Sequence, residues 1–109
     1  MPKYLIEASY TLEDFGRDQG RHEVRRNGRR EAVRQAVESV GGRFEVQYFA
    51  LGEHDAFVIA DLPDHVSAAA ISLAVTATGA ARTKTTALHT PEEVDQAVKK
   101  TVKYEPPRA

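Results

Sequence analysis

The sequence predicts an α+β fold of the ferredoxin-like βαββαβ type, with one four-stranded antiparallel sheet, two helices on one of its faces and an added C-terminal helix. Two observations predict it. Strand and helix patterns follow each other in the order strand, helix, strand, strand, helix, strand. The chain has 109 residues, which is the size of one domain. We expect a single domain over residues 2–103 and a flexible tail over residues 104–109.

The first half of the chain predicts a strand, a loop and a helix. Residues 3–10 alternate, with one face formed by Tyr4, Ile6, Ala8 and Tyr10 and the other by Lys3, Leu5, Glu7 and Ser9. Residues 11–28 are polar and contain three glycines, which is typical of a loop. Residues 29–40 carry an apolar stripe at helical spacing, and Gly41-Gly42 ends this helix.

The second half begins with a predicted hairpin. Residues 43–51 and 56–62 are rich in strand-forming residues and are joined by a short connection that contains Gly52. Pro63 ends the second of these strands, and Asp64 caps a helix that runs to Thr78 and stops at Gly79.

A Thr-rich strand and a final helix complete the predicted order. The strand covers residues 82–88. Thr90, Pro91 and Glu93 have the spacing of a capping box with proline at the first helical position. We expect this last helix to run to Val102.

Both faces of the predicted strands are apolar. In residues 43–51, we expect Phe44, Val46, Tyr48 and Ala50 on one face and Phe49 and Leu51 on the other. In residues 56–62, Phe57 and Ile59 oppose Val58, Ala60 and Leu62. Two helices cover only one face, so the other needs a second chain, the C-terminal helix, or both. We expect a homodimer, and we place Phe49, Leu51, Val58 and Leu62 in its interface.

Several short motifs together resemble the GYD domain family over roughly residues 2–100. They are Pro2-Lys3-Tyr4-Leu5-Ile6, Gly41-Gly42, Tyr48-Phe49-Ala50, Gly52-Glu53-His54-Asp55, Leu62-Pro63-Asp64, Val66-Ser67-Ala68-Ala69 and Thr90-Pro91-Glu92-Glu93-Val94. The resemblance implies a dimeric α/β-barrel in which two ferredoxin-like sheets face each other. Barrel relatives include cofactor-independent monooxygenases, isomerases, haem enzymes and ligand-sensing domains. His54 stands where the resemblance implies a tyrosine.

Two residues are candidates for acid–base catalysis. His54 titrates near neutral pH and lies between two carboxylates, although a surface turn of mixed charge has the same pattern. Glu7 lies on the predicted central strand, where it either contacts a ligand or pairs with Lys84 or Arg82 across the sheet. As ligand-binding residues we expect Ser9, Tyr48, Asp55 and Lys84.

Other chemistry is not indicated by the sequence. The four histidines are widely separated, so we expect no metal site, and no motif indicates a cofactor. The absence of cysteine excludes disulfides and thiolate nucleophiles. The N-terminal apolar run is too short for a signal peptide, and no apolar stretch is long enough for a membrane span. We expect a cytoplasmic protein without a membrane partner.

An arginine-rich segment is the strongest charge feature. It contains seven arginines (17, 21, 25, 26, 29, 30 and 34) and three acidic residues, so its net charge is +4. The net charge of the whole chain is −1. The segment either binds an anionic partner or forms a solvated helix face. The aromatic residues that single-strand binders place between basic ones are missing, so we expect no specific nucleic-acid binding.

These patterns favour a homo-oligomeric domain that binds a small organic or anionic ligand beside the sheet, with residues 11–28 closing the pocket. One alternative is a cofactor-independent oxygenase or isomerase that uses His54 or Glu7 as base in the same pocket. Another is a structural assembly without a ligand.

Overall fold

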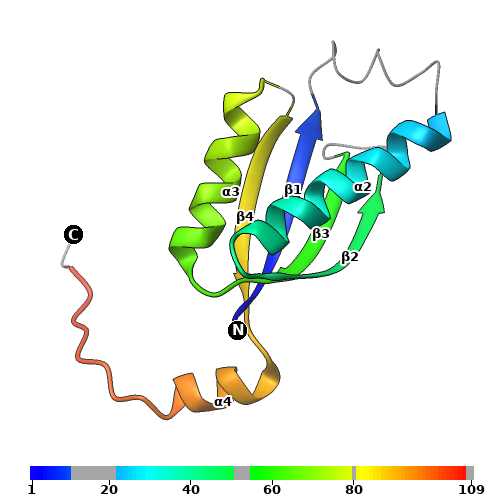
Figure 1. Cartoon of the computed structure of the whole chain (residues 1–109). Helices are drawn as coiled ribbons and strands as arrows, with labels where there is room; N and C mark the ends of the chain where they lie inside the picture. Colours follow the sequence, from blue (N-terminus) through cyan, green and yellow to red (C-terminus); the bar gives the residue numbers. More distant parts are fainter. Residues whose placement is uncertain (11–21, 51–54, 80, 108–109) are drawn as a thin grey trace.

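The structure is a computed structural model that describes residues 1–10, 22–50, 55–79 and 81–107, with the backbone alone over residues 22–29. Within these residues, seven elements follow each other (Figure 1). They are β1 (Lys3–Tyr10), α2 (His22–Ser39), β2 (Arg43–Phe49), β3 (Ala56–Asp61), α3 (His65–Ala77), β4 (Ala81–Leu88) and α4 (Pro91–Val98).

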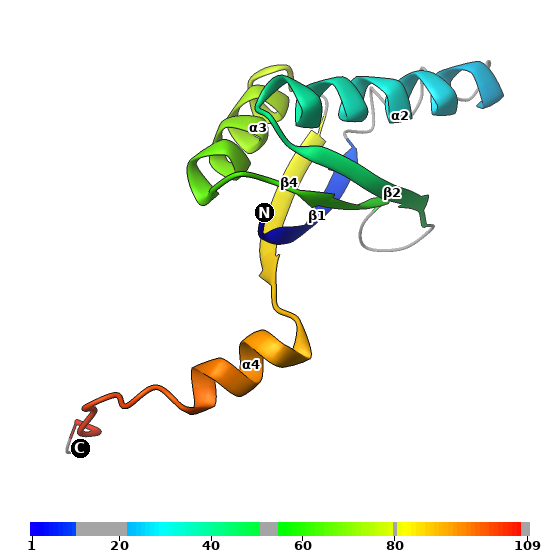
Figure 2. The same ribbon diagram turned by 60° about the horizontal axis from the view of Figure 1, so that its bottom comes forward.

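The four strands form one antiparallel sheet in the order β2-β3-β1-β4. Helices α2 and α3 lie together on one face of this sheet, and Figure 2 shows the other face without a helix against it. The predicted α+β ferredoxin-like fold is therefore confirmed. We call the face opposite α2 and α3 the open sheet face.

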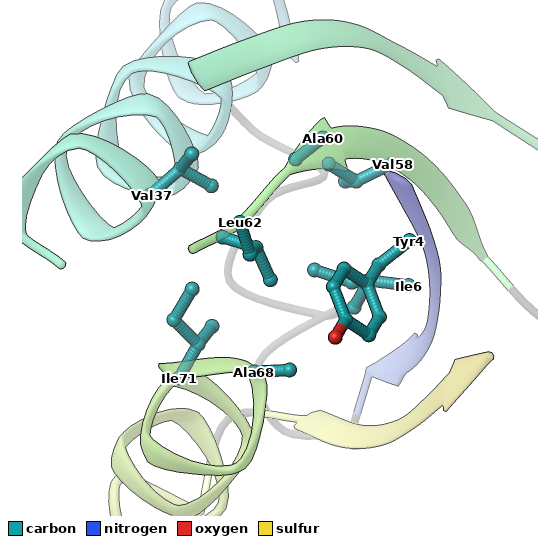
Figure 3. Close-up of a cluster of buried hydrophobic side chains, with 8 residues drawn as sticks. All are labelled: Tyr4, Ile6, Val37, Val58, Ala60, Leu62, Ala68 and Ile71. Carbon is teal, nitrogen blue, oxygen red and sulfur yellow. The ribbon is translucent and has the colours of Figure 1, made fainter. Parts of the chain in front are cut away.

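The hydrophobic core lies between the sheet and the two helices (Figure 3). Its eight buried side chains come from both layers: Tyr4, Ile6, Val37, Val58, Ala60, Leu62, Ala68 and Ile71. The alternation predicted for β1 is confirmed, because Tyr4 and Ile6 enter this core. A polar contact also joins the layers, since the hydroxyls of Ser72 on α3 and Thr85 on β4 are 3.1 Å apart.

Local signals place the ends of α3 where the sequence predicts them. The Asp64 carboxylate accepts a hydrogen bond of 2.8 Å from the Ser67 backbone N–H, which satisfies one of the free donors of the first turn. Gly79 follows the helix with φ of 73°, a left-handed conformation that glycine adopts without strain.

Gly42 is required for close packing. A Cβ atom at this position would lie 2.6 Å from the Asp61 carbonyl oxygen and 2.8 Å from Leu62 Cδ2. The chain therefore passes from α2 into β2 directly against the end of β3, where only a hydrogen atom fits.

Two predicted helix boundaries are wrong. Helix α2 begins at His22 and includes seven residues that we expected in a loop. Its first turns are rich in arginine and include Gly28, so they lack the apolar period on which the prediction rested. Helix α4 ends at Val98, four residues before the expected end, and all of its residues are exposed. Without packing against an apolar surface, little stabilises further turns.

The faces predicted for β2 are also wrong, because the strand contains a register shift between Phe44 and Val46. Phe44 pairs with Ala60 and packs against the core, whereas Val46 pairs with Ile59 on the open sheet face. An extra residue in one strand of a pair reverses the side-chain alternation beyond it.

The expected dimer interface changes accordingly. Val58 and Leu62 are buried beneath the protomer's own helices and are not available to a second chain. Phe49 pairs with Ala56 and so lies on the helix-covered side of the sheet. The apolar residues of the open sheet face include Leu5, Val46, Phe57 and Ile59, with Leu88 opposite Lys3. Leu51 lies outside the described residues.

Residues 89–107, which we call the C-terminal arm, project away from the sheet (Figures 1 and 2). The radius of gyration is 17.0 Å, whereas a compact domain of this length has about 13 Å. Within the described residues, no helix is long and apolar enough to span a bilayer.

Candidate ligand site on the open sheet face

The strand register arranges the open sheet face in rows that cross all four strands. One row contains Val46, Ile59, Leu5 and Thr86, in the order β2, β3, β1, β4. The next row contains Tyr48, Phe57, Glu7 and Lys84 in the same order. Facing residues in such a row have Cβ atoms about 5 Å apart, so their side chains are neighbours.

The second row brings together three of the six predicted site residues. Glu7 lies between Phe57 and Lys84, and Tyr48 is 65% exposed at the edge of the row. The register places the Glu7 carboxylate and the Lys84 ammonium on adjacent strands, as the predicted cross-sheet pair requires. This row offers an acceptor, a cation and two aromatic rings to a molecule on the sheet.

Ser9 continues the site by one further row. It lies opposite Arg82 on β4, and the exposed Arg82 and Lys84 side chains project from the same face. Two positive charges at adjacent positions on one face favour an anionic group, which both can contact through charge-assisted hydrogen bonds.

Asp55 has a different position from the other candidates. Its Oδ2 accepts a hydrogen bond of 2.8 Å from the Tyr10 backbone N–H, and its own backbone N–H donates to the Ala8 carbonyl at 2.8 Å. Asp55 therefore ties the end of β1 to the start of β3, which is a structural role. Its role toward a ligand stays a prediction.

His54 and the adjacent residues 51–53 lie outside the described residues, as do residues 11–21, which we expected to close the pocket. The catalytic role of His54 therefore stays a prediction. The described part of the candidate site consists of Glu7, Ser9, Tyr48 and Lys84.

A charged cluster that the sequence did not reveal lies at the other end of the sheet. Lys3 Nζ is 2.9 Å from Glu45 Oε1 and 3.2 Å from Asp61 Oδ1. The hydrogen bond to Glu45 is the main reason why the pKa of Lys3 is raised above its ordinary value, and the hydrogen bond to Asp61 is the second. Glu45 lies at the register shift in β2, so no alternation rule predicts its position.

Gln47 is a second residue that sequence reasoning missed. Gln47 lies on β2 and pairs with Val58 on β3, which directs its side chain toward the helix-covered face. Both polar atoms of its amide are buried without a hydrogen-bond partner in the described structure. A buried amide in this state favours a water molecule or another polar group beside it.

Two arginines of the arginine-rich segment have described side chains, Arg30 and Arg34. Arg30 is exposed, and Arg34 Nε lies 3.5 Å from Glu31 Oε1 one turn away. The Arg34 guanidinium is also 5.1 Å from the centre of the Phe44 ring, which is within cation–π distance. Residues 17 and 21 and the side chains of 25, 26 and 29 lie outside the description.

Across the described residues, no group of three acidic, histidine or cysteine side chains is arranged to hold a metal ion. The family model of the GYD domain matches residues 4–98. The chain belongs to the GYD domain family. The resemblance noted in the sequence is therefore confirmed.

The match includes every secondary-structure element except the first residue of β1, and it ends at Val98, the last residue of α4. The exposed helix α4 is thus part of the GYD domain and not an appendage beyond it. No curated protein and no solved structure matches the chain.

Proposed function

We propose that this GYD domain is a homodimer that binds a small organic anion between two open sheet faces. The observation that carries the proposal is the open sheet face itself. Three residues of its first row, Val46, Ile59 and Leu5, are apolar. Helix α4 does not cover this row, because every residue of α4 is exposed and the arm projects away. A second copy supplies the missing layer with the same self-complementary patch, as in a two-fold symmetric dimer.

The polar row beside the apolar one supports a ligand between the two sheets. A dry interface would remove the charges of Glu7, Lys84 and Arg82 from water, which is unfavourable even for paired charges. A cavity that holds an anionic ligand gives the positive charges of Lys84 and Arg82 a further partner. Lys84 and Arg82 supply positive charge for an acid group, while Phe57 and Tyr48 supply surface for an apolar or aromatic body.

Native mass spectrometry tests the proposed dimer, and thermal unfolding tests the proposed ligand binding. We expect the mass of a dimer at micromolar protein concentration. A set of small aromatic and aliphatic carboxylic acids is then screened for an increase in melting temperature, and we expect at least one of them to stabilise the dimer.

A pair of charge-removing variants locates the binding site. Lys84→Gln should abolish the stabilisation by the acid, whereas Arg30→Gln, which removes a positive charge from the exposed part of α2, should preserve it. A monomeric mass contradicts the proposed assembly. A dimer whose stabilisation by the acid is equal in natural and Lys84→Gln protein contradicts the proposed site.

A further inference from the structure

The C-terminal arm carries an apolar surface that no described part of the protomer covers. On an α4 helical wheel, Val94, Ala97 and Val98 share one side, while Glu92 and Gln96 lie on the opposite side. Val94 is 50% exposed and Val98 is 79% exposed. Beyond the helix, Val102 and Tyr104 are 76% and 72% exposed, so the apolar surface continues along the arm.

Helix α4 is too short to be stable without packing. It has eight residues, and isolated helices below about 12 residues are marginal in water. Its start is well formed, because the Thr90 hydroxyl accepts from the Glu93 N–H at 3.1 Å and Glu93 Oε1 accepts from the Thr90 N–H at 2.9 Å. A capping box defines where a helix begins, but an apolar stripe stabilises the helix only when another surface covers it.

The direction of the arm indicates which surface that is. In Figure 2 the arm lies on the side of the sheet away from α2 and α3, beyond the end of β4. This is the side of the open sheet face. A second copy that packs on the open sheet face therefore occupies the space beside the arm.

The area that a stable dimer needs gives an independent reason. A sheet of four strands, with a strand spacing of about 4.8 Å and a length of roughly 20 Å, presents on the order of 400 Å² in projection. Stable interfaces bury about 800 Å² on each partner. The arm adds apolar surface on the same side of the sheet toward the area that a stable dimer buries.

Charge is also complementary between α4 and the open face of β4, whereas the residues of the arm beyond α4 include Lys99, Lys100 and Lys103. Within Pro91–Val98 the charged residues are Glu92, Glu93 and Asp95, all acidic. The open face of β4 carries Arg82 and Lys84. An acidic helix beside a basic strand edge of another copy is a favourable arrangement.

We propose that the C-terminal arm packs on the second copy of the chain, so that the two arms are exchanged across the dimer. This inference rests on the proposed homodimer. In this arrangement α4 adds area to the interface and closes one end of the space between the two sheets.

Val98→Lys tests the proposal, and Gln96→Lys is its matched control. Both variants place the same charge in the last turn of α4, where a cation is compatible with the helix dipole, but on opposite sides of the helix. Because Val98 is 79% exposed, the protomer should fold normally in both cases, which circular dichroism checks. By sedimentation velocity we expect the dimer dissociation constant to rise at least tenfold for Val98→Lys and to stay within threefold for Gln96→Lys.

The outcomes separate this inference from the proposed dimer. A natural chain that stays monomeric contradicts both. A natural dimer with an unchanged dissociation constant in Val98→Lys overturns the exchanged arms and leaves the dimer in place. In a mixed sample of isotope-labelled and unlabelled protein, we expect nuclear Overhauser effects from the Val98 methyl groups to the other copy. Such effects only to the protomer's own sheet would show that the arm folds back on its own chain.

Discussion

Leu62→Ala should be among the most destabilising conservative changes in this domain. Leu62 has no exposed surface and lies in the core with Val37, which is also fully buried. The substitution removes three carbon atoms, whose burial contributes about 0.8 kcal/mol each, and leaves a cavity that neighbouring side chains fill only in part. We expect a loss of about 3 to 4 kcal/mol in the free energy of unfolding, a large part of the roughly 5–15 kcal/mol that stabilises a typical domain.

Urea unfolding followed by far-UV circular dichroism measures this loss, at one fixed protein concentration because association also contributes to stability. Leu73→Ala is the matched control, since the same side chain is removed from an α3 position that is 72% exposed. The control should change the unfolding free energy by less than about 0.5 kcal/mol. A loss below about 1 kcal/mol for Leu62→Ala, or an equal loss for Leu73→Ala, would refute the described core.

Two further predictions concern close packing and acid sensitivity. Gly42→Ala should lower the unfolding free energy by about 1–3 kcal/mol, because the added methyl group meets the Asp61 carbonyl oxygen; unchanged urea unfolding would contradict this contact. The hydrogen bond from the Thr90 backbone N–H lowers the pKa of Glu93 below its ordinary value, and the hydrogen bond with the Thr90 side chain adds to this effect. The stabilisation of α4 by Glu93 is therefore complete above the ordinary carboxyl pKa and is lost as the pH falls through the lower folded value. Backbone chemical shifts of residues 91–98 during an acid titration measure this, and Glu93→Ala should remove the transition; helical shifts that persist through the Glu93 titration would contradict it.

The parts of the fold that sequence predicts correctly depend on short-range chemistry. Asp64 caps α3 and Thr90 with Glu93 caps α4, because each pattern requires only residues three positions apart. The faces of β1 also follow directly from alternation.

The errors arise where a distant residue decides the structure. The register shift near Glu45 depends on how β2 pairs with β3, and it moves Val46 and Tyr48 to the open sheet face. Helix α2 begins at His22 without an apolar period in its first turns, so the sequence pattern there does not indicate a helix.

The candidate site also contains residues whose positions follow from the predicted fold and one residue whose position does not. Glu7 and Lys84 are neighbours because the β1–β4 pairing follows from the predicted fold, and Tyr48 joins them through the β2–β3 pairing. The bond from the Tyr10 backbone to the Asp55 carboxylate gives Asp55 a structural role. That bond joins residues 45 positions apart, and no local pattern in the sequence indicates it.

The central claim is that the open sheet face is the surface through which two copies of this GYD domain associate. Sedimentation velocity of Ile59→Glu tests it most directly, because Ile59 lies in the apolar row of that face and is not part of the buried core. Val66→Glu is the control, since Val66 is 65% exposed on α3 and lies on the opposite side of the sheet. We predict a dimer for the natural chain and Val66→Glu, and a folded monomer for Ile59→Glu. A dimer of Ile59→Glu as tight as that of the natural chain would contradict the claim.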